Sequence, residues 1–280
     1  MKGRFIILLT VLLFSNNIQA QMDEKFYHPS KVFQPMDSIN YEEVFIAIDT
    51  VHLNCIFLKP ASKPKATILF LHGDSGNVSN YLFMVRPLVN DGYQVFMVDF
   101  RGYGKSTGTP THINIAHDGQ FILNYLLERK DVKNTKLIVY GASIGTQEAV
   151  HLAKGNQNKI TALILDGTIS SFTDIAVDQS PANEEVVIRH SLISPYSAKE
   201  DIKAIKNMPK LFIHSNQDEQ VPFKEGELVY NNALFPKTFF VYEGNHLQAM
   251  KVNPIGVLRA IDRWMNYTIK KKYSIPTPIK

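Results

Sequence analysis

The sequence predicts a single α/β domain in which a mainly parallel, eight-stranded sheet is covered by helices on both faces. Short β-branched and aromatic runs alternate with longer segments of helical spacing from Thr67 onward. Several of the short runs are continuously apolar, which is typical of strands buried on both faces of a parallel sheet. The 280 residues are 45% hydrophobic and show no internal repeat, so one large core is expected.

The first element in the chain is a predicted signal peptide at residues 1–20. Two basic residues precede an almost entirely apolar stretch at residues 5–14, and a polar stretch then ends at Ala20. This apolar stretch is too short to span about 30 Å of hydrocarbon, which needs about 20 helical residues. Cleavage near Ala20 would export the protein to the periplasm or the cell exterior with no stable membrane anchor. An uncleaved anchor is the alternative.

Residues 21–43 are expected to form a polar lead-in, and residues 44–280 a single domain. Turn residues bound each strand candidate, and the first two candidates lie close enough together to form a hairpin. The predicted strands are residues 44–49, 53–58, 67–71, 94–98, 136–140, 161–165, 210–214 and 238–242. The predicted helices are residues 81–89, 115–127, 144–153, 184–192, 224–234 and 255–269.

The strongest local signal is the segment Gly-Ala-Ser-Ile-Gly at residues 141–145. It follows a predicted strand and leads into a predicted helix, which is the context of a nucleophile elbow. The glycines are expected because so tight a turn leaves no room for neighbouring Cβ atoms. Ser143 would then project at a helix N-terminus, where developing negative charge is favoured. A plain turn with a capping serine is the alternative.

A nucleophilic serine needs a general base and an acid that orients this base. Asp218 and His246 lie just beyond the last two predicted strands. Because open α/β sheets place their sites at the carboxyl ends of the strands, both side chains are expected near Ser143. The chain order of nucleophile, acid and histidine is also the one that this architecture requires. Asp166, directly after the predicted strand 161–165, is the alternative acid.

Two backbone amides are predicted to bind the oxyanion that forms during acyl transfer. The N–H group of Ile144, which follows the nucleophile, would supply one hydrogen bond. The loop after the predicted strand 67–71 would supply the other through Asp74, with Ser75 as the alternative. We expect His72 in this loop to brace the backbone, since His246 already fills the role of base.

These segments together resemble the α/β-hydrolase-fold serine hydrolases, most closely the cap-poor members described as lysophospholipase-like or carboxylesterase-like. The resemblance covers about residues 44–269 and is carried by the loops 72–77 and 99–106, the Ser143 elbow, Asp218 with Val221-Pro222, and Gly244-Asn245-His246. It implies a Ser-His-Asp triad, no cofactor, and hydrolysis of a small-molecule acyl ester, thioester or amide. Ser215 and Asn245 depart from the family pattern at two loops. The 167–209 segment leaves room only for a minimal cap.

Other classes of function find little support in the sequence. The Gly104-Lys105-Ser106 segment lacks the upstream glycine of a phosphate-binding loop. The nine histidines show no spacing typical of a metal site. Beyond residue 20, 28 basic and 26 acidic residues are interspersed, so we expect no nucleic-acid partner. A non-catalytic binding protein and a serine peptidase of the same fold stay as alternatives.

Overall fold

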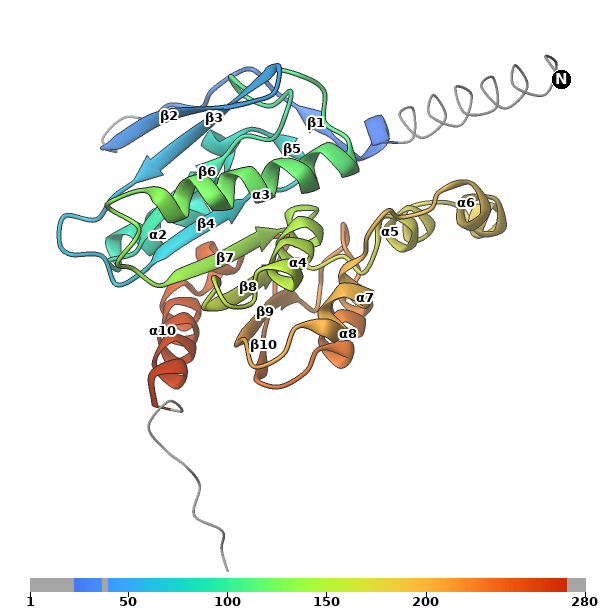
Figure 1. The fold of residues 1–280 in the computed structure, drawn as a ribbon. Helices are drawn as coiled ribbons and strands as arrows, with labels where there is room; N and C mark the ends of the chain where they lie inside the picture. Colours follow the sequence, from blue (N-terminus) through green and yellow to red (C-terminus); the bar gives the residue numbers. More distant parts are fainter. Residues whose placement is uncertain (1–22, 37–39, 271–280) are drawn as a thin grey trace, which may run out of the picture.

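An eight-stranded sheet forms the middle layer of the computed structural model, which describes residues 23–36 and 40–270. The strand order is β10-β9-β8-β7-β4-β6-β3-β2, and β3 runs antiparallel to both of its neighbours while the other described pairings are parallel (Figure 1). The strands are β2 (Tyr41–Ile48), β3 (Val51–Leu58), β4 (Thr67–Leu71), β6 (Gln94–Val98), β7 (Leu137–Ala142), β8 (Ala162–Asp166), β9 (Lys210–Ser215) and β10 (Lys237–Tyr242).

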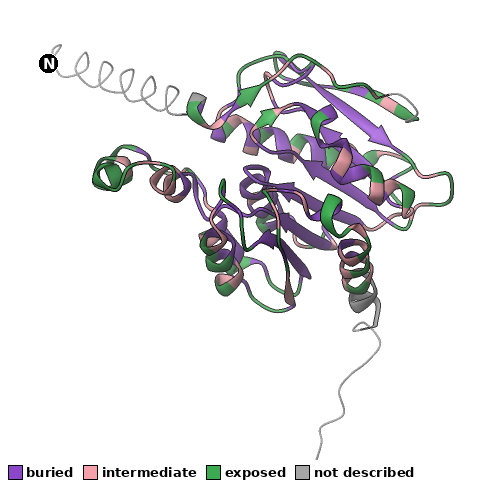
Figure 2. Cartoon of the chain, turned by 180° about the vertical axis from the view of Figure 1, so that it is seen from behind, coloured by how far each residue is buried: buried purple, intermediate pink, exposed green. Residues whose placement is uncertain are grey.

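Helices cover both faces of this sheet, and each face has its own apolar core. One core packs the sheet against α2 (Leu82–Asn90), α9 (Ala249–Val252) and α10 (Pro254–Lys270). The other core packs it against α3 (His112–Glu128), α4 (Gly145–Gly155), α5 (Phe172–Asp178), α7 (Ala198–Asp201) and α8 (Phe223–Asn232). The central strands are therefore buried on both sides, as Figure 2 shows. This arrangement explains why their sequences are continuously apolar.

The predicted fold class is confirmed. All eight expected strands are present, and the first two form the expected hairpin, with Ile48 paired to Val51. Each predicted helix is also present with bounds shifted by a few residues. The 184–192 segment forms α6 (Glu185–Ser191), which directly follows the short 3-10 helix η3 (Ala182–Glu184). The short helices α5, α7 and α9 are not predicted from the sequence, since four to seven residues are too few to establish a period of 3.6.

Only short helices lie between β8 and β9. They are α5, η3, α6, α7 and η4 (Ile202–Ala204), and together they make a thin cap. Helix α6 projects from the body of the molecule and is exposed along its length (Figures 1 and 2). The opening above the carboxyl ends of the strands is therefore bounded by small elements rather than by a second domain.

The start of the described chain is more ordered than a polar lead-in would be. It contains η1 (Glu24–Phe26) and β1 (His28–Pro29), and β1 pairs in parallel with β5 (Ser75–Gly76). Residues 23–30 are called the N-terminal strap below. Through this pairing the strap contacts the loop after β4, which continues through η2 (Val78–Tyr81) into α2. It is therefore attached to the loop that the sequence predicts for the oxyanion.

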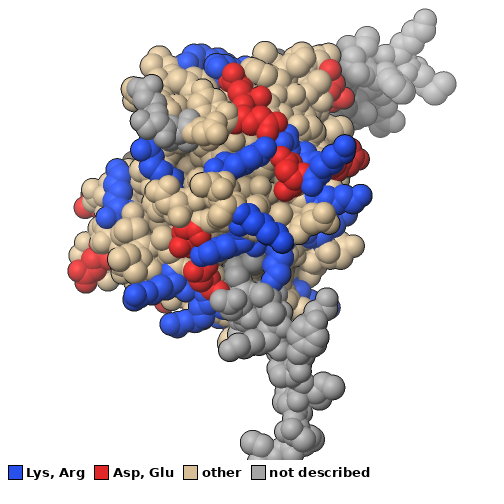
Figure 3. Space-filling model, turned by 90° about the vertical axis from the view of Figure 1, so that its left-hand side faces the viewer, with Lys and Arg blue, Asp and Glu red and all other residues tan. Residues whose placement is uncertain are grey.

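The predicted signal peptide at residues 1–20 lies outside the described residues. Among residues 23–36 and 40–270, no helix is both long and apolar enough to cross a membrane. On the face shown in Figure 3, basic and acidic side chains are interspersed.

Candidate active site

Ser143 stands at a sharp turn between β7 and α4. Its φ angle is 52°, a left-handed conformation that non-glycine residues adopt rarely and at an energetic cost. The flanking glycines make this turn possible: a Cβ on Gly141 would lie 2.5 Å from the carbonyl oxygen of Gly145, and a Cβ on Gly145 would lie 2.3 Å from that of Leu71. The Ser143 amide donates to the carbonyl of Asp166 at 2.8 Å, which fastens the turn to the end of β8. This is the geometry of a nucleophile elbow.

His246 and Asp218 meet beyond the ends of β10 and β9. The His246 Nδ1 atom lies 2.6 Å from Asp218 Oδ2, and both side chains are at least nine-tenths buried. The other carboxylate oxygen of Asp218 accepts the N–H groups of Gln220 and Val221 at 3.0 and 2.9 Å. Burial acts to raise the pKa of Asp218, but the hydrogen bond and the charge of His246 outweigh it, so the pKa is lowered. Asp218 is therefore a carboxylate that accepts the proton of Nδ1–H.

The opposite ring nitrogen of His246, Nε2, is buried and has no hydrogen-bond partner among the described residues. With Nδ1 carrying the proton, Nε2 presents a lone pair. Gly167, at the end of β8, leaves room for this ring, because a Cβ there would lie 2.5 Å from His246 Cε1. The imidazole is thus oriented by Asp218 and free to accept a proton.

Ser143 and His246 line the same cavity, which has a volume of about 90 Å³. Its walls come from the N-terminal strap, the loop 72–77 after β4 (called the oxyanion loop below), the Ser143 elbow, α5 and the loop before α8. The lining residues are Lys25, Phe26, His28, Asp74, Ser143, Ile144, Ile169, Ile175, Gln179, Gln220, Val221 and His246. The structure therefore brings together all five residues that the sequence predicted, four of them at this cavity and Asp218 directly behind His246.

Asp74 and Ile144 both border this cavity, and neither backbone amide donates to another atom within the part of the chain that is described. The carbonyl of Asp74 is held in place by the N–H group of His28 at 2.8 Å and by the hydroxyl of Tyr103. Because these bonds fix the peptide that follows Asp74, they also limit the motion of this loop. Two unused amides beside a serine suit the binding of an oxyanion.

Asp166, the alternative acid in the sequence, occupies a different position. Its side chain is fully buried at the end of β8, where Oδ2 accepts the hydroxyl of Tyr140 at 2.7 Å and Oδ1 has no partner among the described residues. Burial raises its pKa to about 7. His246 Nδ1 is bonded to Asp218 rather than to Asp166. The geometry therefore favours Asp218 as the orienting acid.

Two residues that support the Asp218 loop were not singled out as functional from the sequence. His214 is buried and its Nε2 lies 2.9 Å from the carbonyl oxygen of Val221; burial also lowers its pKa, so the ring is neutral and donates this hydrogen bond. Ser215, which departs from the family pattern, donates to the carbonyl of Gly244 and accepts the N–H of Gln217 at 3.0 Å. Its hydroxyl thus links the Asp218 loop to the His246 loop. Contacts of this kind leave no periodic or motif signal in a sequence.

His72 braces the oxyanion loop, as expected. It is fully buried, Nδ1 lies 2.6 Å from the carbonyl oxygen of Gly73, and Nε2 accepts the N–H of Phe100 at 3.3 Å. Burial lowers its pKa to about 4, so the ring is neutral near pH 7. The bond with Phe100 joins the loop after β4 to the loop after β6, and the bond with Gly73 stays within the loop after β4.

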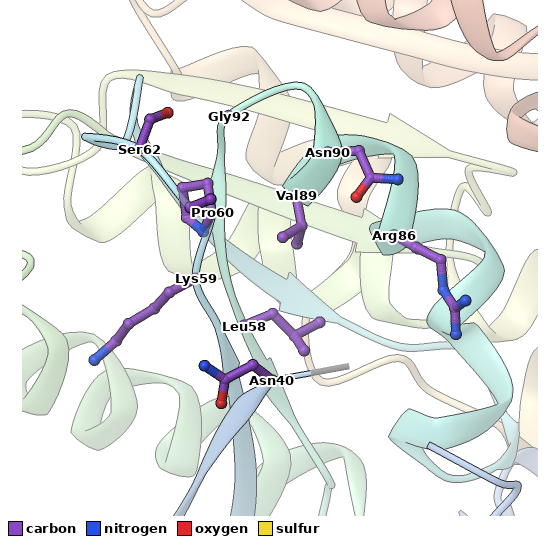
Figure 4. A pocket seen from close by; sticks show the side chains of 10 residues that line it. Asn40, Leu58, Lys59, Pro60, Ser62, Arg86, Val89, Asn90 and Gly92 are labelled. Carbon is purple, nitrogen blue, oxygen red and sulfur yellow. The ribbon is translucent and has the colours of Figure 1, made fainter. Parts of the chain in front are cut away.

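A larger cavity, of about 600 Å³, lies at the other edge of the sheet (Figure 4). Leu58 in its wall pairs with Val95 near the start of β6, so this cavity is remote from the carboxyl ends of the strands. Within the described ranges, its lining holds no histidine, cysteine or carboxylate that could act as a general base. Among the described residues, no group of three or more His, Cys, Asp and Glu side chains could hold a metal ion.

Comparison with known proteins agrees with this fold. A family model for the α/β-hydrolase fold matches residues 66–190. The α/β hydrolase domain-containing protein WAV2 of Arabidopsis thaliana is 32% identical over 206 residues, which are 69% of this chain and 67% of that protein. The chain belongs to the α/β-hydrolase family.

Among its relatives, the uncharacterized protein YfhR of Escherichia coli K12 is 33% identical over 232 residues, or 80% of each chain. Two solved structures share the fold. The esterase Pf2001 of Pyrococcus furiosus has a TM-score of 0.69 at 19% identity and covers 86% of this chain and 98% of its own. An α/β hydrolase of Vibrio vulnificus has a TM-score of 0.69 at 20% identity, with 89% and 92% covered.

Proposed function

We propose that this protein is a serine hydrolase that cleaves an acyl ester bond through a covalent acyl-enzyme. The observation that carries the proposal is the orientation of His246. Its Nδ1 is hydrogen-bonded to Asp218 at 2.6 Å, and its unpartnered Nε2 belongs to the ring that shares a cavity with Ser143. A serine, an oriented imidazole and a buried carboxylate are the three groups that nucleophilic acyl transfer requires.

In the proposed reaction, the Ser143 oxygen attacks the carbonyl carbon of the ester while His246 Nε2 takes the hydroxyl proton. Asp218 keeps the proton on Nδ1 and stabilises the imidazolium that forms. The tetrahedral adduct then collapses, the C–O bond to the leaving group breaks, and His246 gives its proton to the departing alcohol. A water molecule, deprotonated by the same nitrogen, releases the acid and restores Ser143.

The negative oxygen of each tetrahedral adduct would be bound by the amides of Ile144 and Asp74. Both amides lack another acceptor among the described residues, and the α4 helix begins directly after Ile144. The helix dipole adds a favourable interaction at this end. Losing one donor of this kind typically raises the barrier by about 3 kcal/mol. A thioester or amide would follow the same steps with another leaving group.

A fluorophosphonate probe tests this proposal, because its adduct with serine mimics the tetrahedral species. We expect one probe per chain, carried by the peptide that contains residues 141–145 and located by mass spectrometry. Labelling should be lost in Ser143→Ala and strongly slowed in His246→Ala. Ser106→Ala is the matched control: Ser106 is a buried loop serine whose hydroxyl donates to Asp99, and its loss should leave labelling unchanged.

A folded protein that ignores the probe and hydrolyses no aryl ester would contradict the proposal and support a non-catalytic binding protein. Attachment of the probe to another serine would contradict the assignment of Ser143.

We also propose that the protein is exported after cleavage near Ala20, which the charged and apolar pattern of residues 1–20 supports. The mature chain would then begin near Gln21, two residues before the N-terminal strap. Intact-mass analysis of the protein from its native host measures this start. A chain that keeps residues 1–20 and sediments with membranes would show an anchor instead.

A further inference from the structure

We propose that Phe26 of the N-terminal strap limits the acyl group of the substrate to a short chain, of about two to four carbons. This inference rests on the proposed function, since it concerns the cavity that contains Ser143. Phe26 lies in a segment that precedes the first strand of the eight-stranded sheet, and this segment would then help to set the specificity for substrate. Three features carry it: the anchoring of the strap, the position of Phe26 and the size of the cavity.

The strap is anchored on both sides of Phe26. Asp23 accepts the N–H group of His112, at the start of α3, at 3.0 Å, and the hydroxyl of Tyr27 lies 2.8 Å from His112 Nδ1. Asp23 and Tyr27 are both more than nine-tenths buried. One residue further on, the amide of His28 bonds to Asp74. Because residues before and after it are fixed, Phe26 has little freedom to swing out of the cavity.

Phe26 rests on a buried aromatic platform while it also lines the cavity. Its ring lies edge-on to Phe172, with 5.6 Å between centroids, and edge-on to His112 at 5.0 Å. Phe172 and His112 are themselves stacked at 3.5 Å. Burial lowers the pKa of His112 to about 3, so its ring is uncharged and packs as an aromatic group. Edge-to-face contacts of this kind stabilise one position of the ring.

The cavity beside Phe26 is small, and apolar side chains form part of its wall. Its volume of about 90 Å³ corresponds to about three water molecules, and pockets for larger ligands usually hold about 300 Å³ or more. Ile169, Ile175 and Val221 complete its apolar wall. The leaving alcohol departs before deacylation, whereas the acyl group stays bound to Ser143 while water enters. The acyl group is therefore held beside Ser143 in both steps of the proposed reaction, and the alcohol in only one.

The test uses p-nitrophenyl acetate, butyrate and octanoate, which share a leaving group and differ only in the acyl chain. For the unaltered protein we expect kcat/KM to fall about 100-fold from butyrate to octanoate. In Phe26→Ala this ratio should shrink about tenfold, while hydrolysis of acetate changes less than about threefold. Ile175→Ala, which enlarges the same cavity from helix α5, should shift the ratio in the same direction. A change of ratio separates specificity from a loss of folded protein.

Phe121→Ala is the matched control, because Phe121 is an exposed ring on α3 outside the cavity. It should leave the ratio unchanged. Equal rates with butyrate and octanoate in the unaltered protein would overturn this inference and leave the hydrolase proposal intact. An unchanged ratio in both cavity variants would overturn it as well. No Ser143-dependent hydrolysis of any of the three esters would instead overturn the proposed function.

Discussion

The ends of strands β8 and β9 carry two buried carboxyl groups that lie near the same histidine and differ in their surroundings. Asp218, beyond β9, bonds to the His246 ring and accepts two backbone amides, and its pKa is lowered. Asp166, at the end of β8, accepts one hydroxyl group, and burial raises its pKa to about 7. The pKa values of two aspartates at neighbouring places on one sheet edge are thus shifted in opposite directions.

The difference shows that the number of donors, rather than position at the sheet edge, decides which carboxyl group suits a triad. A buried carboxylate is stable only where hydrogen bonds and positive charge offset the loss of water. Asp218 has three donors, two backbone amides of its own loop and the ring of His246. Asp166 has a single donor, from Tyr140. Only Asp218 can therefore stabilise an imidazolium without first losing a proton.

The largest expected effect is on catalysis. Asp218→Asn should lower kcat for an aryl ester about 10⁴-fold, because an amide favours the wrong tautomer of the histidine. Asp166→Asn should lower it less than about tenfold, because the amide oxygen of the new side chain still accepts the Tyr140 hydroxyl. Circular dichroism controls for folding in both variants. The reverse order of effects would place the orienting acid at the end of β8.

The two substitutions should also change the pH dependence of stability in different ways. With a folded pKa of about 7 and an ordinary value near 4, Asp166 keeps its proton in the folded protein after the unfolded chain has lost it. This group therefore lowers the free energy of unfolding as pH rises from about 4 to 7, by at most about 1.4 kcal/mol per pH unit. Relative to the unaltered protein, Asp166→Asn should gain stability across this window.

Asp218 has a lowered pKa, so its contribution to stability is present above about pH 4 and is lost as pH falls below it. The stability difference caused by Asp218→Asn should thus be constant from about pH 5 to 7 and shrink in more acidic solution. Urea unfolding at intervals of one pH unit measures both series. Parallel pH profiles for the two variants would show that the carboxyl groups do not differ in the proposed way.

A smaller effect is expected from Tyr140→Phe, which removes the one hydrogen-bond donor to Asp166. Leaving this buried carboxyl group without a partner should lower the free energy of unfolding by about 1–3 kcal/mol. Because Tyr140 makes no bond to His246 or Asp218, kcat should stay within about threefold. Tyr242→Phe is a useful control, since that hydroxyl bonds to backbone groups of the His246 loop. A loss of activity larger in Tyr140→Phe than in Tyr242→Phe would give Asp166 a part in the reaction.

The smallest effect concerns the link between the two loops. Ser215→Ala removes a hydroxyl that joins the Asp218 loop to the carbonyl of Gly244, and should cost about 1 kcal/mol of stability. We expect kcat to fall about twofold to fivefold, because His246 would be held less firmly. Ser215→Thr keeps the hydroxyl and tests whether this group restores activity. Activity that is unaffected by Ser215→Ala would show that each loop holds its position independently.

Much of this comparison was accessible from the sequence, because Asp166 directly follows one apolar run and Asp218 lies four residues after another. Six of the eight strands belong to a parallel array, so residues that come after their carboxyl ends must gather at one edge. That topology places Ser143, Asp218 and His246 together without any knowledge of side-chain contacts. The same topology places Asp166 at this edge as well, so the sequence leaves both aspartates as candidates for the acid that orients His246.

The N-terminal strap shows the limit of such reasoning. Its residues are mixed in polarity and show neither helical nor strand periodicity, so the sequence predicts only a polar lead-in there. Their partners are remote in the chain: β1 pairs with Ser75, and Asp23 bonds to His112. A two-residue strand and one hydrogen bond between Asp23 and the start of α3 leave no periodic pattern in a short window of the sequence.

By itself, the sequence determined the alternation of strands and helices, the elbow around Ser143 and the set of residues at the sheet edge. These features depend on local polarity, on glycine and on the direction of parallel strands. Only the tertiary structure shows that His246 bonds to Asp218 rather than to Asp166, and that the strap forms part of the cavity wall. Both outcomes depend on hydrogen bonds and burial among residues that are distant in the chain, and these arise only when the whole domain has packed.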